Sequence, residues 1–128
     1  MAGGTDRRVV VTGLGVVTDL GEDVATSWPA LIAGRSGIGP ITAFEQNEEW
    51  PVTIAGEVSG FDPSPRIDHR EARRMDRFCQ LALVAADEAA ADCGIDFKSG
   101  DATRRGVVIG SGVGGILTIE VGHEKLLK

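Results

Sequence analysis

The chain has 128 residues, the length of one domain or of a part of one. Its 13 Lys and Arg against 19 Asp and Glu give a net charge of −6, which disfavours a general nucleic-acid binder because such a protein needs a broad basic face. The 42% hydrophobic content excludes wholesale disorder. No apolar run approaches the roughly 20 residues that cross a bilayer, and the first residues lack the pattern of a signal peptide. We therefore expect a cytoplasmic protein without membrane association.

The first residues predict a tail followed by a strand. We expect residues 1–6 to be disordered. Arg8–Val17 begins with a β-branched run that is typical of a strand buried on both faces. Gly13 and Gly15 then loosen or turn the backbone.

A short helix is predicted over Val24–Ala33, with Gly34 placed to end it. Pro29 lies inside this range, where it removes a hydrogen bond and clashes with the preceding turn. The helix therefore either begins near Ser27 or is kinked. A loop-like stretch follows, and Val52–Val58 then shows partial β alternation.

The strongest helix signal covers His69–Cys93. Asp68 and Glu71 resemble a capping box at its start, and Gly94 is placed to end it. At 100° per residue, one stripe of this helix is apolar and is expected to face a core. That stripe comprises Met75, Phe78, Cys79, Ala82, Ala86, Ala89 and Cys93.

Four arginines of the same helix are spaced to share one arc of about 100°. They are Arg70, Arg73, Arg74 and Arg77. Like charges at i and i+4 cost roughly 0.2 to 0.5 kcal/mol per pair, with partial relief from neighbouring acidic residues. Two interpretations stay open, a solvated face with local ion pairs and a docking surface for an acidic protein partner.

A second strand and a glycine-rich turn complete the alternation of strand and helix signals, so the chain predicts an α/β fold. Arg105–Ile109 has the pattern of another buried strand, Gly110–Gly115 follows it, and Ile116–Leu127 begins an apolar helix. The turn matches G-x-G-x-x-G, which lets backbone N–H groups approach a pyrophosphate, so a nucleotide-binding α/β module is one alternative. The other is a set of glycines that lets a strand end pass close to a neighbouring backbone or pocket.

The Cys and His content offers no convincing nucleophile. Cys79 and Cys93 lie about 21 Å apart along the predicted helix, too far to form a disulfide with each other. Both lie on the apolar stripe, where a small buried hydrophobe is the favoured interpretation. His69 and His123 are the only histidines, and no spacing typical of metal ligands occurs, so we expect neither a metal nor a cofactor.

Several motifs together resemble the β-ketoacyl-acyl carrier protein synthases, the elongating condensing enzymes of fatty-acid synthesis. The stretch R-R-V-V-V-T-G-L-G-V-V-T over residues 7–18 is similar to the start of that family. The Ser, Trp, Leu, Gly and Ser-Gly-Ile within residues 27–38 are similar to its next motif. Residues 73–78 resemble its R-[RK]-M-D-x-F, and residues 110–115 resemble its G-[ST]-G-[IV]-G-G. Two positions depart from the family, since Asp19 stands where Pro is usual and Pro29 lies inside the first helix.

The resemblance implies a thiolase-like fold, layered α/β/α/β/α in the complete family, and a homodimer. It also implies a decarboxylating Claisen condensation of an acyl chain onto malonyl carried by acyl carrier protein. Residues 1–128 match the N-terminal part of the first thiolase-like repeat. The family's catalytic Cys and two His have no matching position here, so no catalytic residue is assigned and the chain alone is expected to be inactive.

The resemblance further implies two sets of site residues. The positions that match the wall of the acyl pocket, near the dimer interface, are Gly112, Val113 and Gly114. The positions that match the basic docking surface for acyl carrier protein are Arg70, Arg73 and Arg74. These matches favour a docking role for the arginines and a pocket wall, in place of a phosphate site, at the glycine turn. A non-catalytic paralogue that shapes a partner's pocket or merely dimerises is a third possibility.

Overall fold

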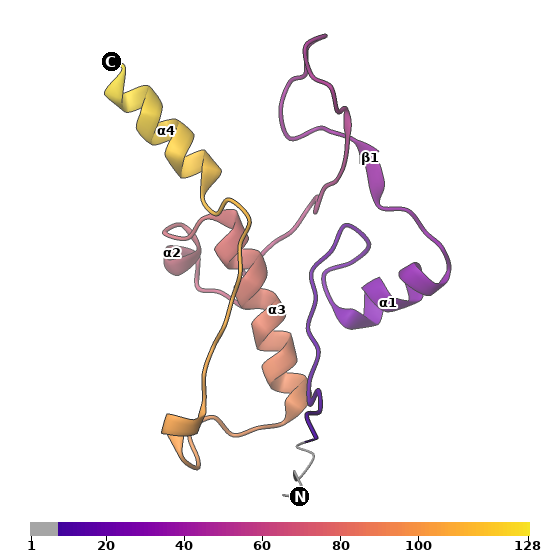
Figure 1. Ribbon diagram of the computed structural model, residues 1–128, viewed down its shortest axis with the longest axis vertical. Coiled ribbons are helices and arrows are strands. Elements are labelled where there is room, and N and C mark those ends of the chain that lie inside the picture. The colour runs from indigo at the N-terminus through magenta and orange to yellow at the C-terminus, as the bar shows by residue number, and fades with distance from the viewer. Residues whose placement is uncertain (1–7) are drawn as a thin grey trace, which may run out of the picture.

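The computed structural model describes residues 8–128, so the tail predicted over residues 1–6 lies outside the described residues. In the view of Figure 1, α3 occupies the middle, while α4 and the region of α1 and β1 extend to opposite sides of it. In chain order the elements are α1 (Val24–Ile32), β1 (Ile38–Pro40), β2 (Ile54–Gly56), α2 (His69–Ala72), α3 (Arg77–Cys93), the 3-10 turn η1 (Ala102–Arg104) and α4 (Ile116–Leu126).

The two predicted buried strands, Arg8–Val17 and Arg105–Ile109, are wrong for the described structure, which assigns neither segment to a strand. Val9 is 92% exposed and Val108 is 98% exposed, so neither run is buried. A strand is held by hydrogen bonds to a neighbouring strand. Within residues 8–128 the one sheet pairs β1 with β2 and includes neither segment. The composition of these segments therefore suits a sheet interior that the described residues do not form.

The second half of the first segment is held instead by carboxylates of α3. Asp92 Oδ2 accepts a hydrogen bond from Leu14 N at 2.8 Å, and Glu88 Oε2 accepts one from Val16 N at 2.9 Å. A Cβ at Gly15 would overlap a backbone carbonyl oxygen of α3. Glycine at this position permits close packing against the helix, which differs from the loosening of the backbone that we expected.

Helix α1 confirms the helix predicted over Val24–Ala33, and it begins at Val24, so the alternative start near Ser27 is wrong. Pro29 lies inside the helix. The chain leaves the helix as predicted, because Gly34 adopts a left-handed conformation with a φ of 68°.

The start of α1 is fixed by two acidic side chains. Asp23 caps the helix by accepting a hydrogen bond from Thr26 N at 2.7 Å. The hydroxyl of Thr26, and then its backbone N–H, hold the pKa of the Asp23 carboxyl below its usual range. Glu88 Oε1 accepts a hydrogen bond from Val24 N at 2.8 Å, so one carboxylate of α3 binds both the first segment and α1.

Strands β1 and β2 form an antiparallel pair in which Ile38 lies opposite Gly56. This pairing confirms β structure within the predicted range Val52–Val58. The carboxylate of Asp19 lies against Gly56, where any Cβ would overlap it. The residue that stands in place of the usual Pro therefore packs against this hairpin.

The helix predicted over His69–Cys93 is interrupted, since α2 ends at Ala72 and α3 begins at Arg77. The predicted cap is confirmed in part: Asp68 Oδ1 accepts a hydrogen bond from Arg70 N at 2.9 Å. Four residues separate two helices where the sequence indicated one.

The interruption between α2 and α3 leaves backbone carbonyls that a side chain satisfies. Asp76 precedes α3 with extended dihedral angles, a φ of −64° and a ψ of 154°. Gln80 Nε2 donates to Ala72 O at 2.8 Å and to Met75 O at 3.1 Å. The bond to Met75 O compensates for a lost helical hydrogen bond, whereas Ala72 O also accepts one from Met75 N at 3.1 Å. At the other end of α3, Gly94 has a φ of 63° and ends the helix as predicted.

A small hydrophobic core gathers between α2, α3 and the segment that precedes them. Its buried members are Phe61, Ile67, Ala72 and Val84, with Val17, Val58, Met75 and Leu81 packed against them. Of the apolar stripe predicted for the long helix, Met75 joins this core, while Ala86 is exposed and the other members are half-buried. The stripe is wrong as a single buried face, because its members in α3 keep their helical spacing but the described residues cover that face only in part.

We predict that Glu88→Gln lowers the melting temperature more than Asp87→Asn. The Gln side chain keeps one acceptor oxygen, so either Val16 N or Val24 N loses its partner, at a cost of about 1 to 2 kcal/mol. Asp87 lies next along α3 and makes an exposed ion pair with Arg66, which is worth about 0 to 1 kcal/mol. Thermal unfolding of the two variants measures the difference, and an equal or reversed order would contradict the role given to Glu88.

Candidate functional site

The three arginines assigned to carrier docking, Arg70, Arg73 and Arg74, are exposed at α2 and directly after it. We call them the arginine surface. The ion pair found among residues 8–128 joins Arg66 to Asp87, so none of the three forms an ion pair within the described residues. Their charges are available to a partner.

Arg77 does not belong to the arginine surface, so the prediction of one arc of four arginines is wrong. The break before α3 interrupts the helical spacing on which that arc depended. The Arg77 guanidinium donates to Val58 O, and its Cζ lies 5.4 Å from the centroid of the Phe61 ring. This cation–π contact and hydrogen bond give Arg77 a structural role at the start of α3.

The glycine turn, Gly110–Gly115, approaches the start of α3 at its last two residues. Gly114 has a φ of 78°, and a Cβ there would lie 3.7 Å from the Phe78 ring. A Cβ at Gly115 would overlap the carboxylate of Asp76. The hydroxyl of Thr118, in the first turn of α4, donates to Asp76 Oδ1. Helix α4 confirms the predicted C-terminal helix, and Asp76 joins its start to α3.

This arrangement disfavours the nucleotide-binding alternative. A G-x-G-x-x-G turn binds pyrophosphate at the N-terminus of the following helix, where backbone N–H groups and the helix dipole attract an anion. In this structure the Asp76 carboxylate lies at that end of α4, against Gly115 and bonded to Thr118. A phosphate placed there would face a carboxylate of the same charge.

The residues assigned to the acyl pocket do not all lie together. Gly114 lines a cavity of about 280 Å³ between the start of α3 and the start of α4. Its apolar walls include Phe78, Leu81 and Ile116. Gly112 and Val113 are not among its lining residues, and Val113 is 71% exposed.

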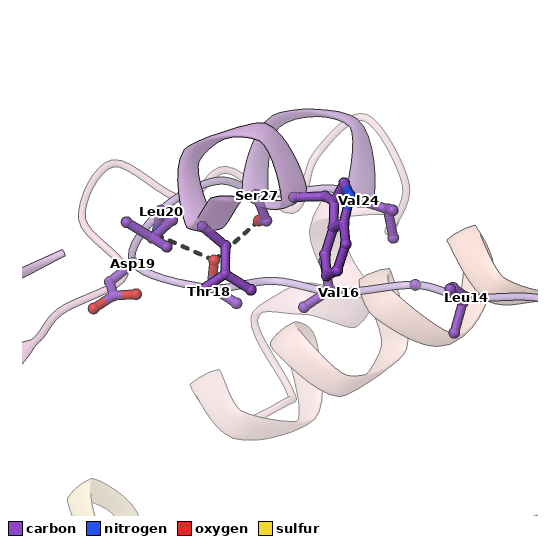
Figure 2. Close-up of a pocket in the computed structure, with 10 residues that line it drawn as sticks. Leu14, Val16, Thr18, Asp19, Leu20, Val24 and Ser27 are labelled. Atoms are coloured by element: carbon purple, nitrogen blue, oxygen red, sulfur yellow. Dashed lines mark hydrogen bonds between the residues drawn. The ribbon is translucent and has the colours of Figure 1, made fainter. Parts of the chain in front are cut away.

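A larger cavity, of about 490 Å³, lies between residues 14–20 and α1 (Figure 2). Its lining is mainly aliphatic, with Trp28 as the aromatic residue. Figure 2 shows the Thr18 hydroxyl hydrogen-bonded to Ser27 and to the backbone N–H of Leu20. The Ser27 hydroxyl also bonds Gly21 O at 3.0 Å, so these hydroxyls are already paired. The cavity offers an apolar shape and no group poised for catalysis.

The sequence did not single out Asp76 and Thr118 as partners. The sequence did carry a signal at Asp76, since Asp is a favoured residue just before a helix. That signal would have indicated a helix that begins at Arg77. Thr118 carried no local signal, because its partner is 42 residues away.

The described residues hold no group of three or more His, Cys, Asp and Glu arranged to bind a metal. Cys79 and Cys93 are free and half-buried, as expected of residues that cannot bridge each other. The Cys93 thiol donates to Ala90 O within its own helix at 3.1 Å. None of the helices in the described structure is long and apolar enough to cross a membrane.

Comparisons with known proteins agree with the motifs. Residues 6–126 match the family described as "Beta-ketoacyl synthase, N-terminal domain". The 3-oxoacyl-(acyl-carrier-protein) synthase 2 of Staphylococcus aureus is 45% identical over 122 residues, which cover 95% of this chain and 29% of that protein. The synthase 2 of Coxiella burnetii is 46% identical over 121 residues, which cover 94% of this chain and 29% of that protein.

A solved structure, "The ishigamide ketosynthase/chain length factor", is similar with a TM-score of 0.62 and 40% sequence identity. The similarity covers 72% of this chain and 23% of that chain. It confirms the predicted fold class, a partial thiolase-like α/β fold. The chain spans about 29% of the length of the curated synthases that it matches. With the family match extending from residue 6 to residue 126, this chain belongs to the β-ketoacyl synthases, as their N-terminal domain.

Proposed function

We propose that this chain is the N-terminal part of a 3-oxoacyl-acyl carrier protein synthase, and that residues 1–128 form part of its first thiolase-like repeat. The observation that carries the proposal is the 45% identity to curated synthases over 95% of the chain. The complete enzyme joins an acyl chain to malonyl on acyl carrier protein, with loss of CO₂ and formation of a carbon–carbon bond. The catalytic Cys and two His belong to the part of the synthase beyond this chain.

Two contributions to that reaction fall within the described residues. The arginine surface binds acyl carrier protein, a partner whose acidic character matches exposed guanidinium groups. The glycine turn, through Gly112, Val113 and Gly114, forms part of the wall of the acyl pocket in the complete synthase. A homodimer and a cytoplasmic location stay predictions of the family resemblance.

The proposal is tested by assaying the complete synthase and this chain side by side. With acyl and malonyl carrier-protein thioesters, the complete synthase is expected to release CO₂ and form a 3-oxoacyl product. Intact-mass measurement of this chain after the same incubation should show no acyl adduct, since it offers half-buried thiols and no matched catalytic histidine. A stoichiometric adduct on Cys79 or Cys93 would overturn the assignment of the nucleophile to the rest of the synthase.

The same assay distinguishes an active synthase from a second candidate, a non-catalytic paralogue. The similar solved structure is named for a chain length factor as well as for a ketosynthase, which keeps this candidate open. A complete protein that neither condenses nor becomes acylated, but changes product length when mixed with an active synthase, would favour the paralogue.

We predict that Arg70→Glu combined with Arg74→Glu raises the KM for carrier-protein substrates of the complete synthase by about tenfold at low salt. Charge reversal turns an attraction for an acidic partner into repulsion, and added salt should shrink the difference from the wild type because it screens exposed charges. Thioesters that lack the carrier protein should react almost unchanged.

Arg35→Glu combined with Arg104→Glu is the matched control, because both residues are exposed arginines away from α2 and the change in net charge is the same. An equal rise in KM for this control, or a defect that salt does not alter, would show that the arginine surface is not a docking site.

We also predict that Val113→Phe in the complete synthase shortens the longest acyl chain that is accepted. A packed pocket wall cannot absorb the extra ring without strain. Steady-state kinetics over a series of acyl lengths measures the effect, and Val52→Phe controls for adding a ring to an exposed position. An equal loss at all lengths would indicate damage to the fold, and no loss at all would place Val113 outside the pocket.

A further inference from the structure

We propose that Asp76 is a positioning residue, which holds the glycine turn of the acyl pocket in place through Thr118. The inference rests on the proposed function and extends it to residues that touch neither the acyl chain nor the carrier protein. It follows from the one described side-chain hydrogen bond that joins α3 to α4, between Asp76 Oδ1 and Thr118 Oγ1.

Asp76 is placed to act on the turn because both of its carboxylate oxygens face α4. Oδ1 accepts the Thr118 hydroxyl. Oδ2 fills the space beside Gly115, so that any Cβ at that position would overlap it. The carboxylate also lies at the N-terminal end of α4, where a negative charge is favourable. Asp76 therefore fixes both the helix that follows the turn and the last residue of the turn.

The start of α3, next to Asp76, is itself held by hydrogen bonds. Although Asp76 directly precedes α3, it makes no side-chain cap bond to that helix, which leaves its carboxylate for α4. Gln80 ties the start of α3 back to Ala72 and Met75, and Arg77 ties it to Val58. A shift of the glycine turn relative to α3 must therefore break the contact between Asp76 and Thr118, while the start of α3 stays in place.

The position of Asp76 also connects the turn to the arginine surface. Arg74 precedes Asp76 by two residues, so the docking surface and the anchor of the turn share one short segment. Phe78, two residues after Asp76, lies beside Gly114 in the 280 Å³ cavity. One short segment, residues 73–78, thus carries part of the arginine surface and also contacts the glycine turn.

The first test measures the turn directly, by amide hydrogen exchange in the complete synthase. Thr118→Val keeps the shape of the side chain and removes the donor. The amides of Gly112, Val113 and Gly114 should exchange about fivefold faster or more than in the wild type. Thr118→Ser keeps the hydroxyl and should restore slow exchange.

The matched control is Thr103→Val. Thr103 donates its hydroxyl to Asp101 Oδ1 at 2.6 Å, the same kind of Thr–Asp bond in the exposed 3-10 turn η1. Its loss should leave exchange at residues 112–114 unchanged. Equal acceleration by both variants, or none from Thr118→Val, would overturn the proposal.

The second test uses the reaction. Thr118→Val should lower the ratio of kcat/KM for the longest accepted acyl chain to that for a short one by about fivefold, with carrier-free thioesters as well as with carrier-protein substrates. In an Asp76→Ala background Thr118→Val should have no further effect, because its partner is gone. A uniform loss at every acyl length, or additive effects in the double variant, would assign both residues a merely structural role.

The two tests keep this inference separate from the proposed function. If the complete protein does not condense, the proposed function fails, while the exchange comparison still decides whether Asp76 holds the turn. If condensation is normal but Thr118→Val does not change amide hydrogen exchange at the glycine turn, only the inference about Asp76 fails.

Discussion

The interruption of the helix between Ala72 and Arg77 is the constraint on which the rest of the site depends. An unbroken helix would have carried four arginines along one face and left the glycine turn without an anchor. With the break, Arg77 contacts Val58 and Phe61, and the arginine surface stays exposed. The Asp76 carboxylate faces α4. Gln80 stabilises the interruption by donating hydrogen bonds to Met75 O and, in addition to Met75 N, to Ala72 O.

Local patterns predicted those parts of the fold that depend on neighbouring residues. The end of α1 at Gly34 and of α3 at Gly94 follow from the left-handed conformations that glycine adopts at low cost, and the cap at Asp68 follows from short-range hydrogen bonding. The prediction of the two strands is wrong because a strand depends on residues that are not its neighbours in the sequence. A β-branched run indicates only that a segment suits a sheet, whereas a strand exists through a neighbour that is often distant in the sequence.

The candidate site residues came from motifs and not from periodicity, and their roles stay predictions. The family resemblance supplied the positions of the arginine surface and of the glycine turn, and the family match over residues 6–126 confirms the family assignment. Helical spacing placed Arg77 wrongly because it assumed an unbroken helix. The contacts of Gly13 and Gly15 with α3, and of Asp76 with Thr118, join residues 42 or more positions apart, so no local pattern could reveal them.

The exposed valines of two segments have a consequence for how such a protein is made. Segments around Val9 and Val108 have the composition of strands, yet within the described residues they are exposed and pair with no neighbouring strand. Unpaired apolar edges are templates for β-pairing between molecules. Pairing of these two segments with segments of other molecules would therefore compete with folding.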